Sequence, residues 1–396
     1  MLKIIDIDRH VVEPEYMWEK YTDKEIFKAY PIKYIEDNYQ QMGERAEKFG
    51  PHAAIKLPPE IFIGDSPIVN HLGLKERLAS ALKSKGIQHK LKAGMSAEAQ
   101  IESLDTDGIE QAFVLPSFAM YIVNHSDIPA NVSLAYANAY NRWLKDYCDY
   151  DPKRLNAVGI MSRHEPANLT AQLDKIIDYG WSCITLRPEV IAGKDIGHNE
   201  YEDFWLKCEK HNIAIAFHGG TNLYAPTVGT DRFTSRFSLH ACSHPMEAQM
   251  AFISLLESGV LERHPNLKIA FLESGASWVP HWLWRLDNIC YPEFPSLVEN
   301  NIKMLPSEYF KRQCWVAIEL GEPCLRDVID VIGHKKLLYG TDFPHPDHLH
   351  FTTDDIAKQL NELTQQELQD VLHNNANDFY SRTAMVNDKN HTEVVK

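Results

Sequence analysis

The stretch Ile213-Ala214-Ile215-Ala216-Phe217-His218-Gly219-Gly220 is an unbroken apolar run that ends in a histidine and two glycines. A short run that is apolar at nearly every position, rather than at every second one, is typical of a parallel strand covered on both faces. Similar runs recur along the chain. The eight predicted strands are Ile4–Asp8, Gln111–Leu115, Leu155–Met161, Cys183–Arg187, Ile213–His218, Leu267–Glu273, Trp315–Glu319 and Leu337–Asp342.

Helical patterns lie between these strands. They cover Ala130–Cys148, Leu169–Tyr179, Tyr201–Lys210, Met246–Leu261, Val279–Cys290 and Leu325–Ile332. Strands that alternate with helices predict an α/β fold, the (β/α)8 TIM barrel. We expect a single domain over residues 1–384, with a long helical insertion at about 11–108 after the first strand and further helices within Thr352–Tyr380. Residues 385–396 form a polar tail.

Charge and composition exclude several classes of protein. The chain has 40 Lys and Arg against 55 Asp and Glu, a formal net charge of −15, and it has no basic run that would favour nucleic acid. No apolar stretch approaches the roughly 18 residues of a membrane-spanning helix, and charges occur too early for a signal peptide. The seven cysteines are scattered without a CxxC pair. We therefore expect a cytoplasmic protein with reduced thiols that binds neither nucleic acid nor membranes.

Polar residues close several of the predicted strands. In a TIM barrel the carboxyl ends of the strands carry the active site. Asp8 and His10 lie two positions apart, so alternation in a strand places both on one side. His218 ends the fifth strand and Asp342 ends the eighth. This set of nitrogen and carboxylate ligands suits Zn²⁺, Mn²⁺ or Fe²⁺, and it leaves an open position for water or substrate.

Other candidate residues lie at the same end of the barrel. Glu273 closes an apolar run, where an unpaired carboxylate is costly to bury, so a metal, a cationic substrate or a nearby Arg would account for it. Glu13, His244 and His345 follow strands 1, 5 and 8. Arg187 ends strand 4 and would either hold a substrate carboxylate or form a structural salt bridge.

Several motifs resemble the amidohydrolase-related, metal-dependent TIM-barrel enzymes. They are Asp8–Pro14, Tyr140–Leu144, Leu186–Pro188, Phe217–Gly220, Ser243–Pro245, Leu272–Gly275 with Trp278–Pro280, and Tyr339–His345. That family includes hydrolases and nonoxidative decarboxylases similar to aminocarboxymuconate-semialdehyde decarboxylase and resorcylate decarboxylase. The resemblance implies that Asp8, His10, His218 and Asp342 bind the first metal ion.

Two departures from the family pattern leave the chemistry open. Strand 4 lacks the lysine that bridges two metals in the binuclear hydrolases, and Glu273 stands where the decarboxylases usually carry a catalytic histidine. Some segments look closer to dinuclear Fe/Fe or Mn/Fe hydroxylases similar to α-aminoisobutyrate hydroxylase. That likeness implies a second metal at Glu13, His244, Glu273 and His345.

Three hypotheses follow. The first is a redox-neutral hydrolase or carboxy-lyase in which one metal polarises a small, carboxylate-bearing substrate or its bound water. Asp342, Glu273 and His345 would then exchange protons, and Arg187 would hold the substrate. The second is an O₂-activating dinuclear monooxygenase. The third is a non-catalytic partner of a related subunit. The insertion would cap the site or form a contact in a homodimer or in a heteromer with that subunit.

Overall fold

The computed structural model describes residues 2–68, 77–78, 81–82, 94–220, 227–345 and 353–381, so the predicted tail at 385–396 lies outside the described residues. All eight predicted strands are present. They are β1 (Ile5–His10), β5 (Gln111–Leu115), β6 (Leu155–Ala157) with β7 (Gly159–Ile160), β8 (Cys183–Leu186), β9 (Ala214–His218), β10 (Lys268–Leu272), β11 (Cys314–Ile318) and β12 (Leu337–Tyr339). Strands β6 and β7 are the two halves of the predicted third strand, separated by one residue.

The strands form a TIM-barrel-like arrangement rather than one closed ladder. One sheet has the order β1-β5-β6 and the other has the order β12-β11-β10-β9-β8-β7, with parallel pairs throughout. At the β1–β12 seam, the His10 amide donates to the Phe343 carbonyl at 2.6 Å and the Asp342 amide donates to the Asp8 carbonyl at 2.7 Å. These bonds bring the first and last strand ends of the barrel together.

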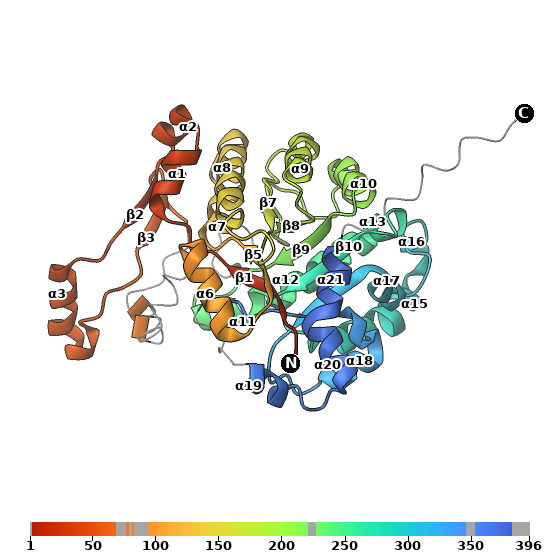
Figure 1. Ribbon diagram of the computed structural model, residues 1–396. Helices are drawn as coiled ribbons and strands as arrows, with labels where there is room; N and C mark the ends of the chain where they lie inside the picture. Colours follow the sequence, from red (N-terminus) through yellow and green to blue (C-terminus); the bar gives the residue numbers. More distant parts are fainter. Residues whose placement is uncertain are drawn as a thin grey trace, which may run out of the picture.

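Helices pack around the outside of the strands (Figure 1). After β5 come α7 (Phe118–Val123), α8 (Ala130–Cys148), α9 (Leu169–Asp178), α10 (Glu202–Lys210), α11 (Arg236–Ser243), α12 (Pro245–Glu257), α13 (Val260–Arg263), α14 (Trp278–Arg285), α15 (Tyr291–Glu293), α16 (Pro295–Val298), α17 (Pro306–Gln313), α18 (Leu325–Ile332), α19 (Thr353–Gln359), α20 (Gln365–Gln369) and α21 (Asn375–Tyr380). No helix in the described ranges is long and apolar enough to cross a membrane.

The barrel interior is a separate apolar cluster that α21 closes. Small and branched side chains of the strands fill it, and Phe379 and Tyr380 of α21 belong to the same cluster. The rings of Phe113 and Tyr380 stack with centroids 3.5 Å apart, and Trp315 lies against Phe379. The C-terminal helices therefore complete the core at the end of the barrel away from the strand tips that carry Asp8 and His218.

The insertion after β1 is only partly helical. It contains α1 (Glu15–Tyr21), α2 (Lys24–Ala29), α3 (Tyr39–Phe49) and α6 (Ala97–Asp107), together with an antiparallel sheet of β2 (Ile32–Ile35), β3 (Glu60–Ile63) and β4 (Ser66–Pro67). This sheet was not predicted from the sequence. Its strands have two to four residues, too few for alternation to stand out. In Figure 1 β2, β3 and α3 extend away from the barrel.

Candidate metal centre

Asp8 and His10 reach the site together, as the alternation in β1 predicts. Asp8 is 3% exposed and His10 is fully buried. The ladder between β1 and β5 shifts register between Asp6 and Arg9, and such irregularities redirect side chains near active sites. His10 Nε2 lies 3.3 Å from Asp8 Oδ1 and 3.2 Å from an oxygen of Asp342. Residues from the first and last strands therefore converge on one point.

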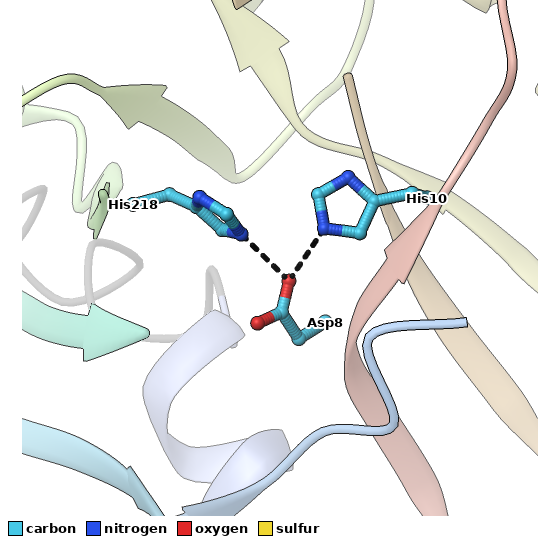
Figure 2. A group of neighbouring side chains, drawn as sticks. All are labelled: Asp8, His10 and His218. Atoms are coloured by element: carbon cyan, nitrogen blue, oxygen red, sulfur yellow. Dashed lines mark ion pairs between the residues drawn. The ribbon is translucent and has the colours of Figure 1, made fainter. Parts of the chain in front are cut away.

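His218 completes the group from the carboxyl end of β9. Its Nε2 lies 3.5 Å from Asp8 Oδ1, and Figure 2 shows both imidazoles directing Nε2 at this one oxygen. His10 Nδ1 contacts the Pro116 carbonyl at 2.8 Å, and His218 Nδ1 contacts the Gly219 carbonyl at 2.8 Å. A carbonyl only accepts hydrogen bonds, so each Nδ1 carries the proton and each Nε2 is left to bind an ion.

Three atoms at this point lack a hydrogen bond although they are buried. They are Asp8 Oδ1, His10 Nε2 and His218 Nε2. Buried polar atoms without a partner are rare and costly in folded proteins. A divalent cation among these atoms would satisfy all three, so the residues present fit a bound metal. Asp8, His10 and His218 each offer a ligand atom within 4.8 Å of the others.

The charges of the site favour a bound cation. Burial opposes ionisation of Asp8, but His218 and His10 lower the pKa of that carboxyl below its usual value. The pKa of Asp342 is also well below its usual value, because His345 and His10 outweigh burial. Burial would lower the pKa of His10, yet Asp342 and Asp8 raise it well above normal, so a metal ion that binds to Nε2 would displace a proton from it. Both carboxylates are thus ionised at neutral pH and attract positive charge.

Glu273 and Asp342 have strained backbones at the strand ends. Their φ angles are 46° and 52°, in the left-handed region that residues other than glycine rarely adopt. Such strain costs on the order of 1–3 kcal/mol per residue and is concentrated at functional sites. In both cases the unusual turn directs a carboxylate toward an imidazole, since Glu273 Oε2 lies 3.2 Å from His218 Nε2 and Asp342 Oδ1 lies 2.7 Å from His345 Nδ1.

His244 and His345 extend the cluster on either side. His244 Nε2 lies 3.4 Å from Glu273 Oε1, so this carboxylate stands between two imidazoles. His345 Nε2 contacts Ser117 Oγ at 2.8 Å, and the ring centroids of His345 and His10 are 4.2 Å apart. Two further groups of possible ligands follow, His10 with Asp342 and His345, and His218 with Glu273 and Asp342.

Glu13 lies apart from these groups. Its carboxylate accepts the backbone N–H groups of Ser117, Phe118 and Ala119 at 2.9–3.1 Å. Glu13 therefore caps the amino terminus of α7, and its partners differ from the metal that the sequence analysis proposed. Spacing along the chain shows that Glu13 follows β1, but it does not show that α7 begins beside it.

Arg187 also has partners other than the predicted substrate carboxylate. It is 2% exposed. Its Nε and Nη2 donate to Glu189 at 3.0 and 2.5 Å, Nη2 also donates to the Gly220 carbonyl at 3.1 Å, and Nη1 donates to the Gly219 carbonyl. The salt-bridge alternative describes this structure, because the guanidinium is already occupied by protein acceptors.

The role of Asp6 was not predicted from the sequence. Its Oδ1 accepts the N–H groups of Asp8 and Thr341, and its Oδ2 accepts Thr341 Oγ1 at 2.5 Å and Arg9 Nη1 at 3.3 Å. Asp6 thus ties β1 to the segment that carries Asp342. Asp6 lies two residues before Asp8, so alternation could have placed it on the same side of β1. Alternation alone, however, does not identify Thr341 as its partner.

A cavity of about 480 Å³ lies beside the cluster. Its acidic and imidazole side chains are Asp8, Glu273, Glu319 and Asp342 with His240 and His244, and the residues described as lining it include no Lys or Arg. An anionic substrate would be repelled from such a cavity unless a cation were bound there. The cavity and the ligand cluster therefore favour one metal-dependent site.

Relatives of known activity match about half of the chain. A 2-amino-3-carboxymuconate-6-semialdehyde decarboxylase from Dictyostelium discoideum is 26% identical over 216 residues, 54% of this chain and 58% of the relative. A 6-methylsalicylic acid decarboxylase from Penicillium expansum is 25% identical over 216 residues, 50% of this chain and 62% of the relative. The match thus spans less than two thirds of the length of either relative.

Solved structures match nearly the whole fold. An amidohydrolase from Mycobacterium avium subsp. paratuberculosis K-10 superposes with a TM-score of 0.73 at 20% identity, over 96% of this chain and 99% of that one. A manganese-bound 5-carboxyvanillate decarboxylase from Novosphingobium aromaticivorans DSM 12444 gives 0.67 at 15% identity, over 96% and 97%. The sequence model described as amidohydrolase matches residues 89–382, well over half of the chain. The chain belongs to the amidohydrolase family.

Proposed function

We propose that the protein is a metal-dependent, nonoxidative decarboxylase of a small aromatic carboxylate. The observation that carries this proposal is the convergence of Asp8 Oδ1, His10 Nε2 and His218 Nε2, three buried atoms without hydrogen bonds. Asp342 is the fourth proposed ligand. The decarboxylase relatives and the manganese in a similar fold support this choice over hydrolysis.

The proposal assigns a separate role to the metal, to His345 and to Glu273. A divalent metal, when bound, supplies positive charge that holds and polarises an anionic substrate in an otherwise acidic cavity. Loss of CO₂ breaks the carbon–carboxylate bond, and the electron pair left on the ring carbon takes up a proton. His345 contacts Asp342 through Nδ1 and Ser117 through Nε2, so it is placed to pass a proton along this path. Glu273 is the other proposed proton-exchanging group.

Product analysis in D₂O tests this function. The protein, stripped of metal and reloaded with Mn²⁺, is incubated with hydroxylated benzoates, and CO₂ and the arene product are measured. We expect a stoichiometric yield of CO₂, one deuterium at the vacated ring carbon, and no O₂ uptake. The variant Asp342→Asn should lose this activity, whereas Arg45→Lys, in the insertion, should keep it. CO₂ release that is unaffected by chelation would contradict the proposal.

A dinuclear hydroxylase is the second candidate, and the position of Glu273 favours it. Its two oxygens face different imidazoles, His218 at 3.2 Å and His244 at 3.4 Å, so Glu273 with these histidines would offer ligands to a second metal ion. Here we expect close to two ions per chain including iron, substrate-dependent O₂ consumption, and loss of about half the metal in Glu273→Gln. One metal ion per chain in both the wild type and Glu273→Gln would reject the dinuclear hydroxylase.

Full metal loading without decarboxylase or hydroxylase activity would favour the third hypothesis, a non-catalytic partner subunit.

A further inference from the structure

A buried ion pair at the end of β8 lies against the backbone that follows His218. Arg187 and Glu189 form a bidentate pair, and their side chains are 1% and 0% exposed. The pair is buried away from bulk water, and the proposed chemistry gives it no role. Buried ion pairs often contribute little net stability, because desolvation offsets their attraction. A role in the site would account for its presence.

The Gly219 carbonyl connects this pair to the metal site. It accepts a hydrogen bond from His218 Nδ1 at 2.8 Å and another from Arg187 Nη1. The bond to Nδ1 fixes the tautomer and the ring orientation of His218, and so fixes the direction of Nε2. The bond from Arg187 is charge-assisted and therefore strong, and it holds the carbonyl in place.

The two glycines after His218 make this contact possible. A Cβ atom on Gly220 would clash with Nη1 of Arg187 and lie 2.8 Å from Nη2. A Cβ atom on Gly219 would lie 3.0 Å from the ring of His244. The backbone therefore packs against the guanidinium on one side and against a second imidazole on the other, which explains why the motif has two glycines.

We propose that Arg187, held by Glu189, is a positioning residue that aligns His218 for metal binding through the Gly219 carbonyl. This inference rests on the metal site of the proposed function. Among the described residues Arg187 makes no hydrogen bond to a proposed ligand, and its hydrogen bonds reach the metal site through the Gly219 carbonyl and His218. Removing outer partners of metal-binding histidines typically costs about 10- to 100-fold in metal affinity.

Calorimetric titration of the metal-free protein with Mn²⁺ tests the proposal. In Arg187→Lys the ammonium cannot hold Glu189 by two bonds and the Gly219 and Gly220 carbonyls at once, so we expect at least a 10-fold loss of affinity. The matched control is Arg45→Lys in α3, which alters another buried Arg with a bidentate partner, Asp37. It should bind Mn²⁺ within twofold of the wild type.

A double-mutant cycle shows whether the effect passes through the backbone that follows His218. In a Gly220→Ala background, where the added Cβ already displaces the guanidinium, Arg187→Lys should cause little further loss of Mn²⁺ affinity. If Arg187→Lys fails to fold, the paired replacement Arg187→Met with Glu189→Met removes the bond without leaving a buried charge and should show the same loss. Equal affinities in Arg187→Lys and Arg45→Lys, or additive losses in the cycle, would overturn the positioning role alone. A wild-type protein that binds no Mn²⁺ would overturn the metal centre as well.

Discussion

Strand β1 carries two sets of buried polar residues with different surroundings. Asp6 and Arg9 are fully buried, and Arg9 donates to Asp6 and to Gln100, Ser103 and Asp107. Asp8 and His10 are equally buried, but each has an atom without a hydrogen bond. The first set is complete within the protein and holds the strand in place. We propose that a cation completes the second set, and this difference would then separate structural from binding residues.

The proposed ligands should be needed for metal but not for folding. The amide of Asn can replace the Nδ1–H donor of His218 but offers no ligand in place of Nε2, so His218→Asn should lose nearly all bound metal and activity. The free energy of unfolding of the metal-free protein should change by about 1 kcal/mol or less, because the atom removed has no hydrogen bond. Elemental analysis and urea unfolding of the same preparation measure both. If His218→Asn lost unfolding free energy but kept its metal, His218 would be a structural residue and not a metal ligand.

The Asp6 side of the strand should behave in the opposite way. Asp6→Asn breaks a buried ion pair with Arg9 and weakens two bonds to Thr341. We expect a loss of about 3 kcal/mol in the free energy of unfolding, while metal stoichiometry at saturation stays at the wild-type value. Asp8→Asn, two residues away, is the matched control and should lose metal instead. Equal losses of unfolding free energy in Asp6→Asn and Asp8→Asn would contradict the distinction between structural and metal-binding residues in β1.

A bound metal should stabilise the folded state only through the set that contains Asp8 and His10. Binding only to the folded protein at 100 times Kd adds about 2.7 kcal/mol to the free energy of unfolding. The wild type should therefore gain thermal stability when Mn²⁺ is added and lose it with a chelator. Asp8→Asn should show neither change in a thermal melt. A shift of equal size in Asp8→Asn would place the bound ion elsewhere.

Glu247 offers a smaller test on a buried carboxylate outside the proposed metal site. Burial, helped by the nearby Glu189, raises its pKa to about 7, although the Val228 N–H and Arg187 oppose the shift. The folded state then holds this proton more tightly than the unfolded state does. Its contribution to stability is therefore complete below about pH 4.5 and is lost as the pH rises toward 7.

The variant Glu247→Gln should remove that pH dependence. We expect the wild type to lose about 2 kcal/mol more than the variant between pH 4.5 and pH 7. Urea unfolding at several pH values measures this difference. Parallel profiles would show that Glu247 titrates normally in the folded protein.

Much of the fold could be predicted because the barrel strands are long apolar runs. Each of the eight appears where the sequence placed it, and Asp8, His10, His218 and Asp342 meet at their ends. The meeting of these side chains was predictable because a TIM barrel brings all carboxyl ends of its strands to one face. Convergence of several ligand-type residues therefore carried more information than any single motif.

The other features could not be predicted, because they depend on which way a side chain turns and on which distant backbone groups lie beside it in the folded chain. The β2–β3–β4 sheet consists of strands too short to show a period. Arg187 lies at the predicted strand end, but its guanidinium turns toward Glu189, two residues on, and the Gly219 carbonyl. Glu13 likewise follows β1 as predicted, yet three N–H groups of α7 occupy its carboxylate. In both cases a nearby backbone group provides the partner, and only the folded chain brings it there.

Metal content per chain is the most direct test of the central claim. Elemental analysis would compare the purified wild type with His218→Asn, each as isolated and after reconstitution with Mn²⁺. We expect at least one divalent ion per chain in the wild type and almost none in the variant. A wild-type protein that holds no metal after reconstitution, or a variant that holds as much as the wild type, would contradict it.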